Sequence, residues 1–294
     1  MQNIATFSIV ARDPVTQELG VAVQSKFLAV GAVVPWAKAN VGAIATQAYA
    51  NLDYGELGLE LLKKGYTADE TLKALLALDE GREDRQVGIV DAQGRAVSYT
   101  GERCHLWAGG LYGDNYACQG NILVNGDTVT AMADTFENSE GTLARRLLEA
   151  LKAAQAAGGD SRGRQSAALL IVRENGSYGG YNDRAVDLRV DDDPEPVEKL
   201  EHLLTLHEMY FEAPTQKEHL NVTPEIAVKL HNALKQLGYD PGVLEAHPYF
   251  EGKLKAAYEA FASSENYEVR LLQGAFIDQR TYQCLLKKAG HEAN

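Results

Sequence analysis

Apolar and polar residues alternate over most of residues 6–47, which is the pattern of strands rather than of helices. Four runs carry this pattern: TFSIVA (6–11), LGVAVQSK (19–26), AVVPWA (32–37) and VGAIATQ (41–47). Asp13-Pro14 and several glycines separate the runs, and these residue types favour turns. The pattern therefore predicts four strands within the first fifty residues.

The period changes after Asn51, where apolar residues recur at helical spacing. Two leucine stripes follow, the first stopping at Gly65 and the second ending near Gly81: Leu57, Leu61 and Leu62, then Leu72, Leu75 and Leu76. Thr67 and Glu70 precede the second stripe at the spacing of a capping box. We expect two helices joined by a tight turn.

The same succession then repeats. Strand patterns occupy 86–101, with a hairpin turn at 91–94, and 115–124; helical patterns occupy 128–136 and 142–157; strand patterns return at 166–174 and 184–192. A further helix is expected from Asp193-Pro194 to Phe211. The order of strands, two helices, strands, two helices and strands does not alternate singly, as a doubly wound sheet would. It predicts an α+β fold, a four-layer αββα sandwich over residues 1–211.

The rest of the chain has a different character. Residues 212–221, EAPTQKEHLN, are polar and are expected to form a linker. Thr223-Pro224 then supplies an N-cap and a first-turn proline, and three apolar helical stripes follow within residues 222–294. We expect a small three-helix domain there. Such a domain is marginal unless it docks on the main domain or on another subunit, because about 70 residues bury little apolar surface.

Composition narrows the classes of partner. With 45% apolar residues and a net charge of −13, the chain is expected to be soluble and to bind neither nucleic acid nor an anionic membrane. It shows no signal peptide and no run of about 20 apolar residues, so we expect a cytoplasmic protein. Cys104, Cys118 and Cys284 have no CxxC spacing, so neither disulfides nor zinc are indicated, and no cofactor is expected.

Several long motifs carry a family resemblance: TFSIVARDPVT, GVAVQSKFLAVGAVVPWA, GNILV, GGDSRGRQSAAL and GGYNDRAVDLRVDDDPEP. Over residues 4–211 the chain resembles the domain of unknown function 1028 family of the N-terminal-nucleophile (Ntn) hydrolase superfamily. The tail, with QLGYDPG and SENYEVRLLQGAFID, resembles a peptidoglycan-binding module. The first resemblance implies an αββα fold and, by superfamily analogy, hydrolysis of an amide-like bond.

Thr6 heads the first strand and is the candidate nucleophile. If Ala11 pairs with Leu19, Thr6 lies opposite Gln24, and Ser25 and Lys26 come within reach. The superfamily resemblance implies that the freed α-amine of Thr6 acts as base, with Ser25 or Lys26 adjusting the local charge. Otherwise Thr6 is simply a β-branched strand residue and Lys26 a solvated one.

The segment MQNIA precedes Thr6 and is a departure from the family pattern. It blocks the α-amine unless the Ala5–Thr6 bond is cut. We therefore expect catalysis by Thr6 only after such processing, or with another group as base.

The loop GGDSRGRQS is the candidate binding loop. Arg164, Gln165 and Ser166 could present donors to a carboxylate or oxyanion, and Asn121 could add an amide donor. Alternatively, the two glycines form a helix C-cap, Arg164 is a surface charge and Asn121 forms a turn. The acidic run 191–193 favours a helix cap over a metal site, and no metal is expected.

Two functions remain open at this point. The first is an Ntn-type amidohydrolase whose small polar or anionic substrate lies between Thr6, residues 24–26 and residues 164–166. The second is a catalytically silent small-molecule-binding protein that has kept the pocket. We also expect a homo-oligomer, because apolar helix stripes that include Phe211 exceed what one subunit covers. The C-terminal module is expected to dock or dimerise; binding to peptidoglycan is possible but is not favoured for an acidic chain.

Overall fold

A computed structural model describes residues 6–246 and 249–291 of the chain. It divides into two compact units, Met1–Leu204 and Thr205–Asn294, which are described separately below. Within the described ranges, none of the helices is both long enough and apolar enough to cross a membrane.

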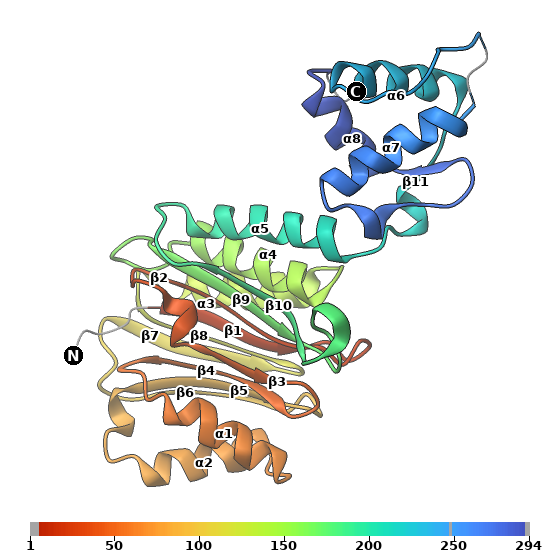
Figure 1. Cartoon of the computed structure of the whole chain (residues 1–294). Helices are drawn as coiled ribbons and strands as arrows, with labels where there is room; N and C mark the ends of the chain where they lie inside the picture. The colour runs from red at the N-terminus through yellow and green to blue at the C-terminus, as the bar shows by residue number, and fades with distance from the viewer. Residues whose placement is uncertain (1–5, 247–248, 292–294) are drawn as a thin grey trace. The chain divides into compact units, whose positions relative to one another are not determined.

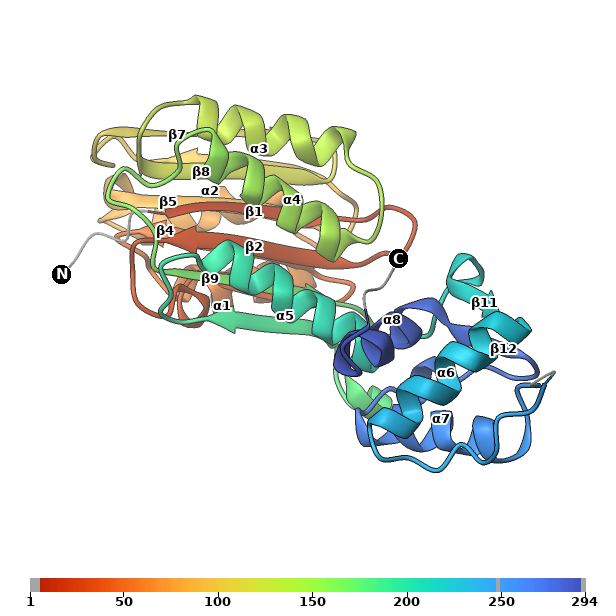
Figure 2. The same cartoon turned by 90° about the horizontal axis from the view of Figure 1, so that it is seen from above.

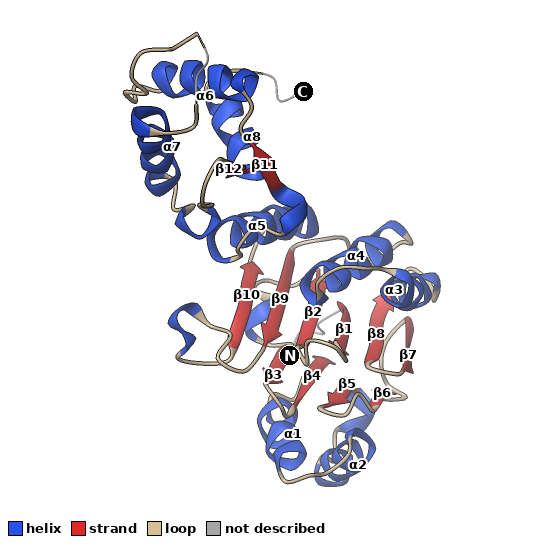
Figure 3. Cartoon of the chain, turned by 90° about the vertical axis from the view of Figure 1, so that its right-hand side faces the viewer, coloured by secondary structure: helices blue, strands red, loops and turns tan. Residues whose placement is uncertain are grey.

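The first unit is the predicted four-layer αββα sandwich (Figures 1 and 3). All neighbouring strands of its two sheets pair antiparallel. The six-stranded sheet has the order β10-β9-β2-β1-β8-β7: β10 (Arg184–Val190), β9 (Ser166–Val172), β2 (Leu19–Ser25), β1 (Thr6–Arg12), β8 (Tyr116–Leu123) and β7 (Trp107–Gly113). The four-stranded sheet has the order β3-β4-β5-β6: β3 (Pro35–Lys38), β4 (Gly42–Ala48), β5 (Arg85–Asp91) and β6 (Ala96–Thr100).

Helix pairs cover the outer face of each sheet, as Figures 1 and 2 show. The four-stranded sheet is covered by α1 (Asp53–Lys63) and α2 (Ala68–Leu78). The six-stranded sheet is covered by α3 (Asp127–Asn138), α4 (Leu143–Ala156) and the first part of α5 (Pro196–Phe211). The predicted capping box at the start of α2 is confirmed, because Thr67 and Glu70 exchange side-chain to backbone hydrogen bonds.

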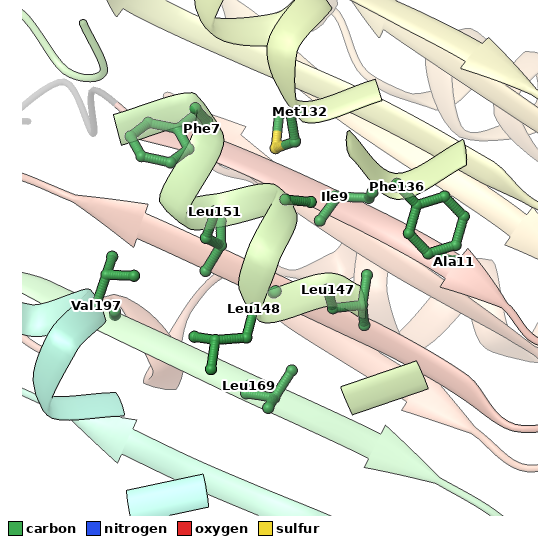
Figure 4. Close-up of a cluster of buried hydrophobic side chains, with 14 of the residues drawn as sticks. Phe7, Ile9, Ala11, Met132, Phe136, Leu147, Leu148, Leu151, Leu169 and Val197 are labelled. Atoms are coloured by element: carbon green, nitrogen blue, oxygen red, sulfur yellow. The ribbon is translucent and has the colours of Figure 1, made fainter. Parts of the chain in front are cut away.

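Alternation along β1 assigns its residues to two cores. Phe7, Ile9 and Ala11 point to the helices and pack with the apolar stripe of α4 (Figure 4). Val10 belongs to the core between the two sheets. Ser8 and Thr6 lie two and four residues before Val10, so their side chains face the same space between the sheets. Polar residues on a fully buried strand need hydrogen-bond partners, so a polar site at this strand lies between the two sheets.

The register between β1 and β2 differs by one residue from our expectation. Thr6 lies opposite Ser25, and Phe7 lies opposite Gln24. The turn is the reason: the Asp13 N–H donates to the Glu18 carbonyl, so the first pair outside the turn joins residues 12 and 19. The Asp13 carboxylate also accepts two backbone N–H groups within the turn, which holds this register.

The sequence patterns did not indicate β7. Its sequence WAGGLYG contains three glycines, and most of its side chains are exposed or half-buried. Such a strand lacks the alternation that a buried face imposes, because it lies at the edge of its sheet.

The second unit contains the three predicted helices, α6 (Pro224–Gln236), α7 (Gly252–Ser264) and α8 (Gln279–Lys288), around one apolar core. The predicted Thr223 N-cap and the first-turn proline of α6 are confirmed. A short hairpin of β11 (His219–Asn221) and β12 (Phe276–Asp278) accompanies the helices. Residues 212–221 thus include β11 and the 3-10 turn Gln216–Glu218.

A buried arginine organises this unit. Arg270 is 2% exposed and forms ion pairs with Asp278 and Glu218. Its guanidinium also donates to the carbonyls of Glu208 and Glu212, so it joins the end of α5 to the hairpin and to α8. The free-energy cost of removing the guanidinium from water is offset because several acceptors surround it.

Candidate functional site

The start of β1 brings together several predicted site residues. Thr6 lies directly opposite Ser25 on β2 and Asn121 on β8, and all three are buried. The Thr6 hydroxyl donates to Ser25 Oγ over 3.1 Å. Ser166 lies opposite Ser25 on β9, and its hydroxyl accepts from the Val30 N–H and donates to the Phe27 carbonyl. Ser166 therefore holds the turn after β2.

Gln24 lies on the other face of the sheet. It is paired with Phe7, which points to the helices, and alternation places Gln24 on that same side. Its side chain is fully buried, and neither amide atom has a hydrogen-bond partner within the described residues. The structure does not bring Gln24 to Thr6, because the one-residue register shift reverses its face.

A network of buried amides lies behind Thr6 between the two sheets. Gln47 on β4 and Gln86 on β5 form a cross-strand pair, with Nε2 of Gln47 donating to Oε1 of Gln86 over 2.8 Å. Asn121 Nδ2 donates to the same oxygen over 2.9 Å. Gln47 Nε2 also lies 3.4 Å from the Thr6 carbonyl. The network thus orients the Asn121 amide beside the candidate nucleophile.

Ser8 and Gln119 extend this network along β1 and β8. The Ser8 hydroxyl donates to Gln47 Oε1 over 2.6 Å and accepts from Gln119 Nε2 over 2.7 Å. Sequence reasoning missed Gln47, Gln86 and Gln119. The available signal was a glutamine at a core-facing position in three otherwise apolar strands, where an amide is costly unless it is paired.

Three strained backbone positions surround the same region. Ala48, Leu106 and Ile122 have φ values of 64°, 54° and 53°, in the left-handed region that non-glycine residues avoid. Ala48 follows Gln47, and Ile122 follows Asn121. The Ile122 N–H donates to the His105 carbonyl, and the Ile122 carbonyl accepts from Ser161. Strain that neighbours hold in place in this way clusters at functional sites.

Lys26 and the loop before β9 lie at the same end of the sandwich. Lys26 Nζ is exposed and donates to the Arg164 carbonyl over 3.3 Å. The Arg164 guanidinium pairs with Glu195, and the Gln165 amide donates to Asp192 over 3.0 Å. The structure therefore brings Lys26 close to the loop but engages the side chains of Arg164 and Gln165 with the segment before α5.

Asp160 and Arg162 are site residues that the sequence did not single out. The Asp160 carboxylate is buried and accepts the Lys26 N–H over 2.8 Å. Arg162 pairs with Asp160 and also donates to the Lys26 carbonyl over 3.3 Å. Their position in a loop rich in glycine and charge resembles ordinary surface sequence, so only the contacts distinguish them.

The remaining reactive groups do not offer an alternative centre among the described residues. Burial raises the pKa of the Cys104 thiol to about 11, which leaves little thiolate at neutral pH. No group of three or more metal-ligating side chains occurs within residues 6–246 and 249–291. In the acidic run, the Asp193 carboxylate accepts the Glu195 N–H in the turn before α5.

Comparisons with known proteins agree with this architecture. A family model described as "Family of unknown function (DUF1028)" matches residues 6–200, and one described as "Putative peptidoglycan binding domain" matches residues 210–285. The crystal structure of protein SPO2555 from Silicibacter pomeroyi, assigned to DUF1028, is similar with a TM-score of 0.63 and 32% identity. The match covers 69% of this chain and 89% of that chain. No curated protein matches the chain.

Proposed function

The chain belongs to the DUF1028 family, and from this premise we propose that it is an Ntn-type hydrolase acting on an amide-like bond of a small polar substrate. The observation that carries the proposal is the contact of the Thr6 hydroxyl with Ser25 Oγ, with Asn121 on the other side of Thr6. A hydroxyl nucleophile needs a base and an oxyanion donor, and these neighbours supply polar groups at the required place.

In the proposed reaction, Thr6 Oγ1 attacks the substrate carbonyl and its proton passes to the α-amine of Thr6. That amine forms only when the Ala5–Thr6 peptide bond is cut, because Thr6 is otherwise an internal residue. Residues 1–5 lie outside the described part of the chain. The α-ammonium then gives the proton to the substrate nitrogen as the amide C–N bond breaks, so the amine leaves and an acyl-enzyme ester remains on Thr6. Water hydrolyses this ester, which regenerates the Thr6 hydroxyl and releases the acid.

Asn121 is the proposed oxyanion donor. One of its N–H groups is engaged by Gln86, which sets the orientation of the amide. A preorganised donor in a buried site is worth far more than one in water, because it needs no reorganisation during the reaction. The amide network behind Thr6 would therefore contribute to catalysis by holding this group in place.

The substrate is proposed to carry an anionic group. The Lys26 ammonium is exposed and donates to the Arg164 carbonyl over 3.3 Å. Lys26 therefore adds positive charge at this end of a chain with a net charge of −13. An anion close to Thr6 would be stabilised by this charge.

One observation favours the alternative function, a catalytically silent small-molecule-binding protein. Thr6 is fully buried in the chain that retains residues 1–5, and its nitrogen is part of a peptide bond. A chain that is never processed would keep the αββα site without hydrolysing anything.

Processing and a covalent probe distinguish the two functions. Intact-protein mass spectrometry is expected to show loss of residues 1–5, and a chain produced with Thr6 as its first residue is expected to acylate with a β-lactone probe. Thr6→Ala should abolish labelling, and Thr6→Ser should retain it. The control variant Thr16→Ala changes an exposed turn hydroxyl and should label as the parent chain does. A chain starting at Thr6 that stays unlabelled would favour the binding protein.

The second unit contains a peptidoglycan-binding-like domain, and we propose that it serves as a docking or dimerisation element. Phe211 is 53% exposed and its ring lies against those of His207 and Tyr210, so this unit presents aromatic surface at the end of α5. Light scattering should give a mass above one subunit for the parent chain and a lower mass for Phe211→Glu. A strict monomer at micromolar concentration, or saturable sedimentation with purified peptidoglycan, would contradict this role.

A further inference from the structure

The segment from residue 159 to residue 165, called the strap below, precedes β9 and contacts both of the strands that flank β1. β1 lies between β2 and β8 in the six-stranded sheet. Neighbouring strands are about 4.8 Å apart, so β2 and β8 are separated by about 10 Å. A segment that contacts the ends of both strands must cross the end of β1 between them, and that end is Thr6.

The strap is attached to β8 by two backbone hydrogen bonds, which make up an isolated bridge, and by one side-chain hydroxyl. Asp160 forms an isolated antiparallel bridge with Leu123. The Ile122 carbonyl accepts from the Ser161 N–H over 3.0 Å and from the Ser161 hydroxyl over 2.8 Å. The Val124 N–H donates to the carbonyl of the first strap residue over 3.2 Å. These contacts fix one side of the crossing.

The other side is attached to β2. The Lys26 N–H donates to Asp160 Oδ2 over 2.8 Å, and Arg162 donates to the Lys26 carbonyl over 3.3 Å. The Gln165 N–H donates to the Ser25 carbonyl over 3.1 Å. Asp160 thus contacts both flanking strands, one through its backbone bridge and the other through its carboxylate.

The Asp160 carboxylate is the group that joins the two attachments. Its side chain is 0% exposed, and it accepts from the Arg162 backbone N–H over 2.9 Å as well as from the Arg162 guanidinium. Gly159 and Gly163 have φ values of 64° and 109°, a conformation that other residues rarely adopt. Glycine at these two positions therefore lets the backbone follow the course of the strap without strain.

We propose that Asp160 is a positioning residue that latches the strap across the Thr6 end of β1 and sets the positions of Lys26 and Arg162. The functional meaning of this latch rests on the function proposed above, because Thr6 heads the strand end that the strap crosses. Opening of the strap would clear this end of β1 for a substrate, and the Asp160 charge favours the closed arrangement.

Limited trypsin digestion of the full chain tests the latch, because Arg162 and Arg164 lie within the strap. Asp160→Asn keeps the size of the side chain and removes its charge. It should be cut at these two arginines about tenfold faster than the parent chain, because charge-assisted hydrogen bonds hold the closed state. The Lys26 amide should also exchange hydrogen faster. Asp160→Glu, which restores the charge, should recover part of the protection.

Asp91→Asn is the matched control. Asp91 is 1% exposed and its carboxylate likewise accepts a distant backbone N–H, that of Ala68, and pairs with a nearby arginine, Arg95. It should not accelerate cutting in the strap. Equal cutting of the strap in both asparagine variants would overturn the proposal, since the effect would then be general destabilisation.

A second variant keeps the test decisive if Asp160→Asn does not fold. Ser161→Ala removes one hydrogen bond on the β8 side and leaves Asp160 in place. It should raise strap cutting by a smaller factor, and protection unchanged from the parent would count against the latch. β-Lactone labelling of Thr6 should rise with strap opening. Absence of labelling in every variant would reject the hydrolase while leaving the digestion result to decide the latch.

Discussion

Replacing Gln86 by leucine tests the amide network most directly. Gln86 is fully buried and holds both sheets together at the Thr6 end. Its Nε2 group lies 2.8 Å from Thr100 Oγ1, 2.8 Å from the Gly120 carbonyl and 3.2 Å from the Gly109 carbonyl. Its Oε1 atom accepts from Gln47 and Asn121. Leucine has a similar size but can neither donate nor accept, so the variant isolates the hydrogen bonds.

The expected cost follows from the groups that are left unpaired. The buried Asn121 amide loses its Gln86 partner, and a buried unsatisfied polar group costs about 1–3 kcal/mol. The half-buried Thr100 hydroxyl also loses its Gln86 partner and adds a smaller cost. Gln47 Nε2 keeps its longer contacts at 3.4 Å, so its loss is smaller. The free energy of unfolding of the first unit should therefore fall by about 3 kcal/mol.

Urea unfolding monitored by tryptophan emission measures this change. Trp36 and Trp107 are the two tryptophans of the chain, and both lie in the first unit, so their emission does not report unfolding of the second. With a slope of about 3 kcal/mol per molar urea, the transition should move down by about 1 M. Gln93→Leu, at an exposed position after β5, is the control and should change stability by less than about 0.5 kcal/mol.

A double-mutant cycle provides the refutation. In a chain that already carries Gln47→Leu, the Gln47 amide donor is absent. Gln86→Leu then leaves one fewer buried donor without an acceptor. The double variant should cost less than the sum of the two single variants by about 1–3 kcal/mol. Additive losses, or a loss for Gln86→Leu no larger than for Gln93→Leu, would show that the amide network does not stabilise the fold.

Single groups elsewhere allow three further tests. Arg270→Met leaves the buried Asp278 carboxylate uncompensated and should cost the second unit about 3–5 kcal/mol, seen as faster amide exchange in residues 205–291 with unchanged tryptophan emission. The hydrogen bond from Arg85 holds the pKa of Asp79 well below its usual range, so its stabilisation is present above the unfolded pKa of about 3.9 and is lost as pH falls towards the folded value. Asp79→Asn should therefore be less stable than the parent at pH 7 and approach it towards pH 2 in urea titrations; an unchanged difference would contradict this assignment. Burial raises the pKa of Cys118 well above its usual range, so iodoacetamide at pH 8 should leave it unmodified in the native chain and alkylate it in urea.

The sequence alone determined the elements and their layers. Local signals are sufficient for a helix such as α2, where Thr67 and Glu70 mark the start and the leucine stripe marks the buried face. Short apolar runs are a similarly local signal for β2 and β9, which are buried on both sides of the sheet. Because two-helix and multi-strand blocks follow each other along the chain, their order also predicted the αββα arrangement.

The pairing of those strands was decided by tertiary structure. Alternation assigns a residue to a face only once the register is known, and the register depends on how the Asp13 turn closes. A shift of one residue therefore exchanged Gln24 for Ser25 opposite Thr6. The edge strand β7 was equally out of reach, because its exposed side chains leave no periodic pattern.

The candidate site required contacts between residues far apart in the sequence. Gln47, Gln86 and Asn121 come from three different strands, and their amides become a network only when the two sheets face each other. Asp160 and Lys26 are 134 positions apart and meet because the strap crosses the end of β1. Sequence patterns report burial and local conformation, whereas a site depends on which distant groups the packed layers bring within hydrogen-bonding distance. This is the physical reason that Thr6, Ser25 and Asn121 could be proposed from the sequence while the amide network behind them could not.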